Sequence, residues 1–370
     1  IIPANSAAAS GGYDVANSCR FDDGSSAYLH KTPSGAGNRQ KFTFSCWVKK
    51  TSGGTEELLS VGGSTYTRIG FEAGDEIKIF HVASGSTAWE IQTVAKYRDP
   101  SAWYNFVFAF DTTQGTASNR IKLYVNGVRV EPSSGFGDET YPDQNYTTEV
   151  NNAVKHRVGI ANNDSSAPFD GYMSEVVLID GQQLAPTEFG EFNEDSGIWK
   201  PIDVSGLTFG TNGFYLDFED SANLGNDANG GTDLTEVNLT AIDQSTDTCT
   251  NNFATLNPLD VNPSSAGDAF TEGNLKLVTN NNSNAAGTRS NIAVSSGKWY
   301  AEVKYTSATA WNGVAAMDVN FHTSSMGAGT ISWYQGRTLY VDGSNTANWG
   351  SAVSAGDIVG IALDMDNSRV

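Results

Sequence analysis

The sequence predicts an all-β protein made of antiparallel sandwiches, and three observations lead to this fold class. Apolar and polar residues alternate with a period of two through most of the apolar stretches. Glycine occurs 39 times in 370 residues, and turn-forming segments separate short strands. We find no helical segments that could connect parallel strands, so a parallel sheet is not expected.

The first strands are clearest in KFTFSCWVKK at residues 41–50 and in WYNFVFAFD at residues 103–111. Alternate side chains of a strand point to the same face of a sheet. Each segment therefore presents one apolar face to a core, made of Phe42, Phe44, Cys46 and Val48 in the first strand and of Tyr104, Phe106, Phe108 and Phe110 in the second.

The segment IKLYVNGVRV at residues 121–130 predicts a complete β-hairpin. Asn126 and Gly127 tolerate the positive φ angles that both central positions of a type I′ turn require. The expected cross-strand pairs are Val125–Val128 and Leu123–Val130 on the core face and Tyr124–Arg129 on the solvent face.

Later strands are expected at residues 156–162, 171–180 and 213–220. One short helix is expected at residues 184–194, because Pro186 suits a first helical turn and acidic residues follow it.

The chain is predicted to contain two sandwiches joined by a connector. Residues 221–256 are polar and rich in turn formers, which is typical of a connector. The alternation of apolar and polar residues resumes after residue 256, and the sequence stops just past the apolar run in GDIVGIALDMDNSRV. The predicted organisation is a sandwich at 1–220, the connector at 221–256 and a second, incomplete sandwich at 257–370.

Charge and composition exclude several partner classes. Lys and Arg number 22 against 42 Asp and Glu, which gives a formal net charge of −20. A net negative charge of this size repels phosphate backbones and anionic lipid, so binding of nucleic acid or of a membrane surface is not expected. No stretch approaches the roughly 18 apolar residues of a spanning helix. The 3 cysteines form no disulfide framework, which favours folding in a reducing compartment.

Four motifs carry a resemblance to a known family. FTFSCWVKK, WYNFVFAFD, IKLYVNGVRV and FDGYMSEVVLIDGQQL stand in the order found in a laminin-G-like domain of the concanavalin A-like jelly-roll class. The resemblance covers about residues 10–220. It implies an antiparallel jelly roll in which SAYLHKTP at residues 26–33 and the strand at 213–220 are neighbours.

The second part resembles the start of a SPRY domain. GKWYAEVKY at residues 297–305 matches an early strand of that family, and GDIVGIALDMDN at residues 356–367 matches a central one. The remaining strands of a SPRY sandwich would follow Val370, so this domain is expected to be incomplete.

Longer stretches, including IIPANSAAASGGYDVANSCRFDDGSSAYL and DTCTNNFATLNPL, resemble virion proteins of tailed marine phages. The resemblance implies a structural protein of the virion, assembled in the host cytoplasm. As a tail fibre or appendage it would bind other virion proteins and a host surface glycan or outer-membrane protein, as a homotrimer. The alternatives are a head-decoration or tail-scaffold protein and, less favoured, a polysaccharide depolymerase.

A catalytic site is not expected. Retaining glycosidases hold two carboxylates about 5–5.5 Å apart, and alternate residues of one strand could supply them. No Glu-x-Asp pattern occurs, and the nearest pair, Asp217 and Glu219, lies at a strand end. We therefore predict a protein that is not an enzyme.

Calcium is the cofactor that the sequence favours. Laminin-G-like domains often carry one Ca²⁺ at a sheet rim, and the segment DSANLGNDANG offers the oxygen ligands Asp220, Asp227 and Asn229. The interpretation that we rank above a calcium site is that these residues only form turns.

Two aromatic residues are candidates for ligand binding. Trp311 and Trp349 are flanked by Asn and Gly, so loops are expected to present them as stacking surfaces. The alternative for both is a place in a core, which is the expectation for Trp299 in GKWYAEV.

Overall fold

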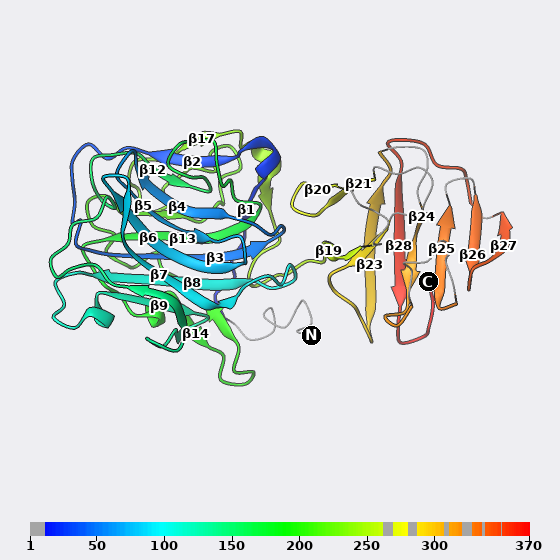
Figure 1. The fold of residues 1–370 in the computed structure, drawn as a ribbon. Coiled ribbons are helices and arrows are strands. Elements are labelled where there is room, and N and C mark those ends of the chain that lie inside the picture. The colour runs from blue at the N-terminus through cyan, green and yellow to red at the C-terminus, as the bar shows by residue number, and fades with distance from the viewer. Residues whose placement is uncertain are drawn as a thin grey trace. The chain divides into compact units, whose positions relative to one another are not determined.

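The computed structural model describes residues 12–261, 269–279, 287–306, 311–319, 328–334, 337–348 and 350–370. The all-β prediction is confirmed (Figure 1). The chain divides into two compact units. The N-terminal unit contains the described residues up to Ala254 together with Thr271–Leu275, and the C-terminal unit contains those of Thr255–Phe270 and Lys276–Val370.

The N-terminal unit is a sandwich of two antiparallel sheets with eight strands each. Sheet A has the order β10-β9-β8-β3-β13-β1-β18, and β16 also pairs with β13. Its strands are β1 (Ser18–Phe21), β3 (Lys41–Lys50), β8 (Tyr104–Asp111), β9 (Ile121–Val125), β10 (Val128–Arg129), β13 (Gly171–Asp180), β16 (Phe214–Leu216) and β18 (Gln244–Ser245).

Sheet B has the order β11-β7-β6-β5-β4-β12-β2-β17. Its strands are β2 (Tyr28–Lys31), β4 (Glu56–Gly62), β5 (Tyr66–Phe71), β6 (Glu76–Ala83), β7 (Ser86–Lys96), β11 (Phe136–Thr140), β12 (His156–Val158) and β17 (Thr235–Val237).

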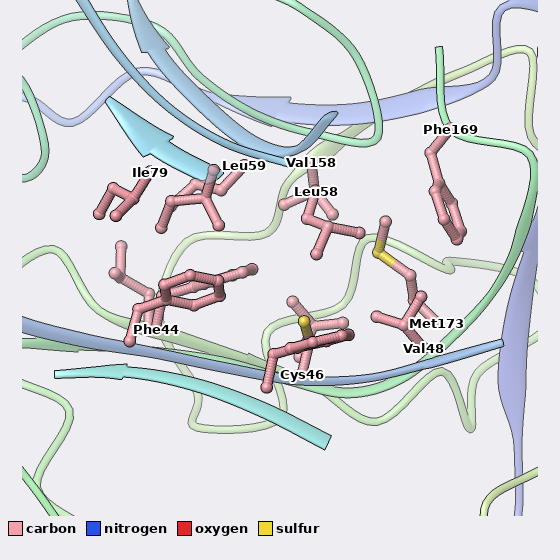
Figure 2. Close-up of a cluster of buried hydrophobic side chains, with 14 of the residues drawn as sticks. Phe44, Cys46, Val48, Leu58, Leu59, Ile79, Val158, Phe169 and Met173 are labelled. Atoms are coloured by element: carbon pink, nitrogen blue, oxygen red, sulfur yellow. The ribbon is translucent and has the colours of Figure 1, made fainter. Parts of the chain in front are cut away.

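The main core lies between the two sheets. Figure 2 shows Phe44, Cys46 and Val48 of β3 facing Leu59, Ile79 and Val158 of sheet B. The alternation predicted in β3 and β8 is confirmed, because Phe42, Phe44, Phe106, Phe108 and Phe110 are all fully buried in this cluster.

The outer face of sheet A is buried as well. Residues after β13 fold back over it and form a second apolar cluster with Val177 and Ile179. The helix expected at 184–194 is absent there. That segment makes only the 3₁₀ turn η3 (Pro186–Glu188) before the hairpin of β14 (Gly190–Phe192) and β15 (Trp199–Pro201).

A buried ion pair fixes the last part of this outer layer. Lys49 is fully buried, and its Nζ lies 2.7 Å from Oδ2 of Asp247. The same ammonium donates to Oδ1 of Asn252 at 2.8 Å and to the carbonyl of Phe253 at 2.7 Å. Trp103 Nε1–H donates to the second oxygen of Asp247 at 3.1 Å. Residues 247–253 are therefore held against the outer face of sheet A.

A β-bulge in β13 adds another polar contact to this layer. The strand register shifts between Ser174 and Val177, and Glu175 has a φ of 50°. Its buried carboxyl group accepts a hydrogen bond from the hydroxyl of Tyr215 at 2.8 Å. Burial raises the pKa of Glu175 to about 8, so this group is protonated at neutral pH.

The predicted connector is folded in the structure. Within residues 221–256, β17 pairs with β2 and β18 pairs with β1, so the segment completes an edge of each sheet. The prediction that residues 26–33 and 213–220 form neighbouring strands is wrong, because β2 lies in sheet B and β16 lies in sheet A. The strands β17 and β18 have only three and two residues, which is too short to show an alternating pattern in the sequence, so the connector was expected to lack strands.

The predicted hairpin is confirmed in register. Val125 pairs with Val128 and Tyr124 with Arg129, and Asn126 and Gly127 have φ angles of 48° and 76°. A Cβ at Gly127 would also lie 2.3 Å from the ring of Trp199, which excludes a larger residue. On the predicted core face, Leu123 is buried and Val125 and Val130 pack half-buried against the core, but Val128 is 61% exposed.

The C-terminal unit is built from short strands. β23 (Lys298–Lys304) pairs with β28 (Ile358–Asp364), and β24 (Trp311–Ala315), β25 (Thr330–Tyr334), β26 (Thr338–Val341) and β27 (Ser344–Asn348) form a four-stranded sheet. Tyr305 links the two sheets through an edge contact with Trp333 at 6.4 Å. Other short strands are β19 (Leu256–Val261), β20 (Ala269–Thr271), β21 (Lys276–Val278) and β22 (Thr288–Ser290).

Trp299 departs from the expected core position, since it is 37% exposed and donates to the carbonyl of Ser296. The SPRY resemblance of this unit and its incompleteness stay predictions. No helix formed by the described residues is long and apolar enough to span a bilayer.

Replacing Lys49 by Met should strongly destabilise the N-terminal unit, because Asp247 would remain buried without its cation. We expect a loss of about 3–5 kcal/mol in the free energy of unfolding, measured by urea denaturation. Lys96→Met is the matched control, since Lys96 is 42% exposed and pairs with Glu76 at the surface. The control should cost about 1 kcal/mol or less. Equal losses in the two variants would contradict the role given to Lys49.

His156 should make stability depend on pH. Its Nε2 accepts a hydrogen bond from the backbone N–H of Asn151, so the proton of the neutral ring lies on Nδ1, which donates to the carbonyl of Val154. Burial lowers the pKa of His156 to about 4. An unfolded histidine titrates near about 6.5, so the unfolded chain binds more protons between these values and stability falls as the pH drops through this window.

We therefore expect His156→Gln, whose amide can reproduce both hydrogen bonds, to lose less stability than the unsubstituted protein on acidification. The difference in the free energy of unfolding between about pH 7 and pH 4.5 should be about 2 kcal/mol, measured by urea denaturation at each pH. The same pH dependence in both proteins would show that His156 does not carry the effect.

Candidate functional site

The outer face of sheet B carries a row of polar and aromatic side chains that crosses the strands. The row follows from the strand register, in which Arg157 pairs with His30 and Ser60, Ser60 with Arg68, Arg68 with Phe80, and Phe80 with Glu90. Residues between these positions, such as Ile69 and Ile79, point into the core. The alternation of β5 and β6 therefore places Arg68 and Phe80 side by side on the outside.

The centre of this row combines two rings with three charges, and we call Tyr66, Arg68, Lys78, Phe80 and Glu90 the Arg68 face. All five are half-buried. The rings of Tyr66 and Phe80 meet edge-on with centroids 6.1 Å apart. The guanidinium of Arg68 lies 4.7 Å from the centroid of Tyr66 and 6.0 Å from that of Phe80.

Arg68 is held in place from behind. Its Nη1 donates to Oε1 of Glu57 at 3.1 Å, and its Nε and Nη2 both donate to Oδ1 of Asn162. Glu57 is buried, and burial raises the pKa of this carboxyl group to about 7 although Arg68 lowers it. Three of the five N–H donors of the guanidinium are thus used, and the fixed orientation leaves the other two for a ligand.

Lys78 and Glu90 complete the face. The Lys78 ammonium lies 2.7 Å from Oε2 of Glu90, 3.5 Å from Oε1 of Glu72 and 5.1 Å from the centroid of Phe80. Their side chains are 16% and 28% exposed, respectively. Both donors and acceptors therefore lie beside a half-exposed ring.

Such a surface has the chemistry that carbohydrate recognition requires. Sugar rings present C–H groups on a face, which pack on aromatic rings, and hydroxyl groups at their edges. A hydroxyl donates to a carboxylate and accepts from a guanidinium or ammonium, which the Arg68 face offers within one patch.

The predicted ligand-binding residue Trp311 begins strand β24. It is 39% exposed and packs against Tyr334 at 4.8 Å and Tyr340 at 4.5 Å between ring centroids. The structure thus shows a partly exposed aromatic trio in the C-terminal unit. Trp349 lies outside the described residues, and the proposed role of both tryptophans stays a prediction.

The role of Asp220, Asp227 and Asn229 as calcium ligands stays a prediction. Asp220 and Asn229 are exposed, and Asp227 is buried. Oδ1 of Asp227 accepts from the backbone N–H groups of Tyr215 and Asn229, and Oδ2 lies 3.7 Å from Nζ of Lys31. Asp227 therefore organises a turn and lies near a lysine.

The acids weighed as a catalytic pair also form a turn. Oδ1 of Asp217 accepts from the backbone N–H of Glu219 at 3.1 Å, and Glu219 is exposed just after β16. Sequence reasoning had not singled out the Arg68 face. Its signal is the pair of neighbouring segments TYTRIGF and EIKIFHV, in which Tyr66, Arg68, Lys78 and Phe80 occupy the outward positions.

Comparison with known proteins supports the fold of the N-terminal unit. Residues 23–188 match the family described as the concanavalin A-like lectin/glucanases superfamily, Laminin_G_3. No curated protein matches the chain.

Several solved structures are similar to this chain. A Bacteroides ovatus protein with a proposed carbohydrate-binding role is 16% identical over 60% of this chain and 58% of its own, with a TM-score of 0.40. A SAP-like pentraxin of Limulus polyphemus is 13% identical over 47% of this chain and 80% of its own, with a TM-score of 0.34. The CBM40 of a Ruminococcus gnavus IT-sialidase, bound to α2,3-sialyllactose, is 16% identical over 39% of this chain and 89% of its own, with a TM-score of 0.29.

Proposed function

We propose that this chain, whose N-terminal unit contains a laminin G/concanavalin A-like lectin-type domain, is a non-catalytic protein that recognises carbohydrate through the Arg68 face. The observation that carries the proposal is the guanidinium of Arg68, which Glu57 and Asn162 orient beside the rings of Tyr66 and Phe80.

Preorganisation supports this choice of surface. The Arg68 side chain is only 16% exposed and already bonded on one side, so binding a ligand costs little further side-chain entropy. The outer face of sheet A is unsuited to this role because the residues after β13 cover it. Sheet B therefore offers the sheet face for a sugar chain.

We further propose that the protein acts as a tail fibre or other appendage of a phage virion. The support is the resemblance of its N-terminal and connecting stretches to virion proteins of tailed phages. In this role it would be assembled in the host cytoplasm, would contact other virion proteins, and would bind a glycan or outer-membrane protein of the host. A homotrimer would multiply weak glycan contacts into avidity.

The aromatic trio of Trp311, Tyr334 and Tyr340 supports a second contact surface in the C-terminal unit. The rings of Tyr334 and Tyr340 lie within 4.8 Å of the Trp311 ring between centroids, and Trp311 is partly exposed, which suits stacking on a sugar or on an aromatic side chain of a partner.

Replacing Phe80 by Thr should weaken glycan binding by at least about tenfold, because it removes the ring on which a sugar would pack while keeping a residue suited to a strand. Arg68→Met should have a similar effect through loss of charge-assisted hydrogen bonds. Binding of the full chain to an array of bacterial surface polysaccharides, followed by titration calorimetry with the best ligand, measures both effects.

Val128→Thr is the matched control, since it changes an exposed apolar residue on the hairpin of sheet A. It should bind glycan as the unsubstituted chain does. Glycan binding that survives both Phe80→Thr and Arg68→Met would exclude the Arg68 face as the site. No binding by the unsubstituted chain to any glycan, combined with stable binding to phage particles that lack it, would favour the architectural alternative.

A further inference from the structure

The buried side chain of Lys49 contacts a carboxamide as well as a carboxylate. Its Nζ donates to Oδ1 of Asn252 at 2.8 Å and lies 2.7 Å from Oδ2 of Asp247. The carbonyl carbon of Asn252 is one bond of about 1.2 Å from Oδ1, so it lies no more than about 4 Å from the lysine nitrogen. Atoms poised to react are typically about 3–3.5 Å apart, so a small rotation of either side chain brings this nitrogen and this carbon into reacting distance.

The carboxamide of Asn252 is held from its other side. Its Nδ2 donates to the backbone carbonyl of Ser101 at 2.7 Å, whereas its Oδ1 accepts from Lys49. Both ends of the planar group are therefore bonded, and its carbonyl carbon is fixed beside the lysine. Because the fold holds the two groups in one place, most of the entropic cost of bringing them together is already met.

Asp247 is placed to move protons between these groups. Its Oδ2 contacts the lysine nitrogen, and its Oδ1 accepts from the indole N–H of Trp103 at 3.1 Å and from the backbone N–H of Phe253 at 3.3 Å. The side chains of Lys49 and Asp247 are 0% and 6% exposed, respectively. A proton exchanged between them is therefore shielded from water and stays within the pair.

Aromatic rings enclose the lysine and the aspartate. Trp103 and Tyr172 belong to one buried cluster, with ring centroids 6.5 Å apart, and Nζ of Lys49 lies 5.9 Å from the centroid of Tyr172. Burial in such surroundings disfavours charged forms, so it lowers the pKa of Lys49 and raises the pKa of Asp247. Both shifts favour the neutral pair, in which the lysine is a free amine and therefore a nucleophile.

We propose that Lys49 and Asn252 join in an isopeptide bond, with Asp247 as the catalytic acid and base. Nζ of Lys49 first gives a proton to Oδ2 of Asp247, and the neutral amine then forms a bond to Cγ of Asn252. As the bond between Cγ and Nδ2 breaks, Asp247 passes a proton to the leaving nitrogen and takes the second proton that Nζ gives up. Ammonia departs, and Asp247 remains as the neutral acid. No electrons are gained or lost, so the step needs no oxidant.

The bond would fasten the outer layer of sheet A covalently. It links residues 203 positions apart, one in β3 and one in the segment held against that sheet. A cross-link that closes a long loop stabilises a fold by restricting the unfolded chain, as in a protein with disulfides. The three cysteines of this chain are all free. The isopeptide would therefore supply a cross-link that persists in a reducing compartment.

Mass spectrometry of the intact full chain, after incubation at neutral pH, tests the proposal. We expect a mass lower than that of the sequence by one molecule of ammonia. A succinimide at another asparagine also releases ammonia, so a tryptic digest then locates the change. The expected product is a branched peptide in which Lys49 is joined to the segment that contains Asn252. An unchanged intact mass, or a digest in which Lys49 is free or is joined to Asp247, would overturn the proposal.

Four variants separate the reaction from folding, which circular dichroism checks. Asn252→Asp should reach the same mass as the unsubstituted chain, because loss of water from this variant and loss of ammonia from the original give the same isopeptide. Asn252→Ala lacks the carboxamide and Asp247→Asn lacks the proton carrier, so both should keep their full mass. Asn251→Ala is the matched control, since Asn251 is the exposed neighbour, and it should still lose ammonia. Loss of ammonia by Asn252→Ala, or its absence only in Asn251→Ala, would contradict the proposal.

Discussion

The buried ammonium of Lys49 and the carboxylate of Asp247 hold together the layer that closes sheet A from outside. A buried charge without a partner would strongly destabilise the fold. Here the Lys49 ammonium contacts Asp247, Asn252 and the carbonyl of Phe253. The pair joins two residues that lie 198 positions apart in the sequence. With this layer in place, sheet A is a central sheet, whereas the outer face of sheet B stays half-exposed at the Arg68 face. The location of the candidate binding surface follows from that asymmetry.

Much of the fold could be predicted from the sequence because long strands carry long alternation. β3 and β8 have ten and eight residues, and their phenylalanines lie in the core as the pattern indicates. The hairpin followed from two turn residues, Asn126 and Gly127, whose backbone conformation few other residues adopt. The short strands β17 and β18 could not be predicted, because two or three polar residues acquire strand geometry only from the neighbour that pairs with them.

The candidate sites were harder to predict for a related reason. Arg68 and Phe80 lie at outward positions of ordinary strands, and they form one surface only because the register between β5 and β6 places them opposite each other. The clustered aspartates Asp22, Asp23 and Asp170 come from two segments distant in the chain, which become neighbours only through the pairing of β1 with β13. In contrast, Asp220, Asp227 and Asn229 are close in sequence and look like a ligand set, yet Asp227 turns to Lys31 and to backbone amides.

The pairing of β17 with β2 and of β18 with β1 has a consequence for biosynthesis. The two strands that leave the ribosome first in this unit receive their edge partners only when residues 235–245 have been made. Until then the nascent chain exposes unpaired backbone on both sheets, which is a hazard for association between chains. A recombinant fragment cut at Asp220, or at residue 188 where the family match ends, would keep that hazard permanently. The smallest piece worth expressing therefore extends to Leu275, because Thr271–Leu275 belong to the same compact unit.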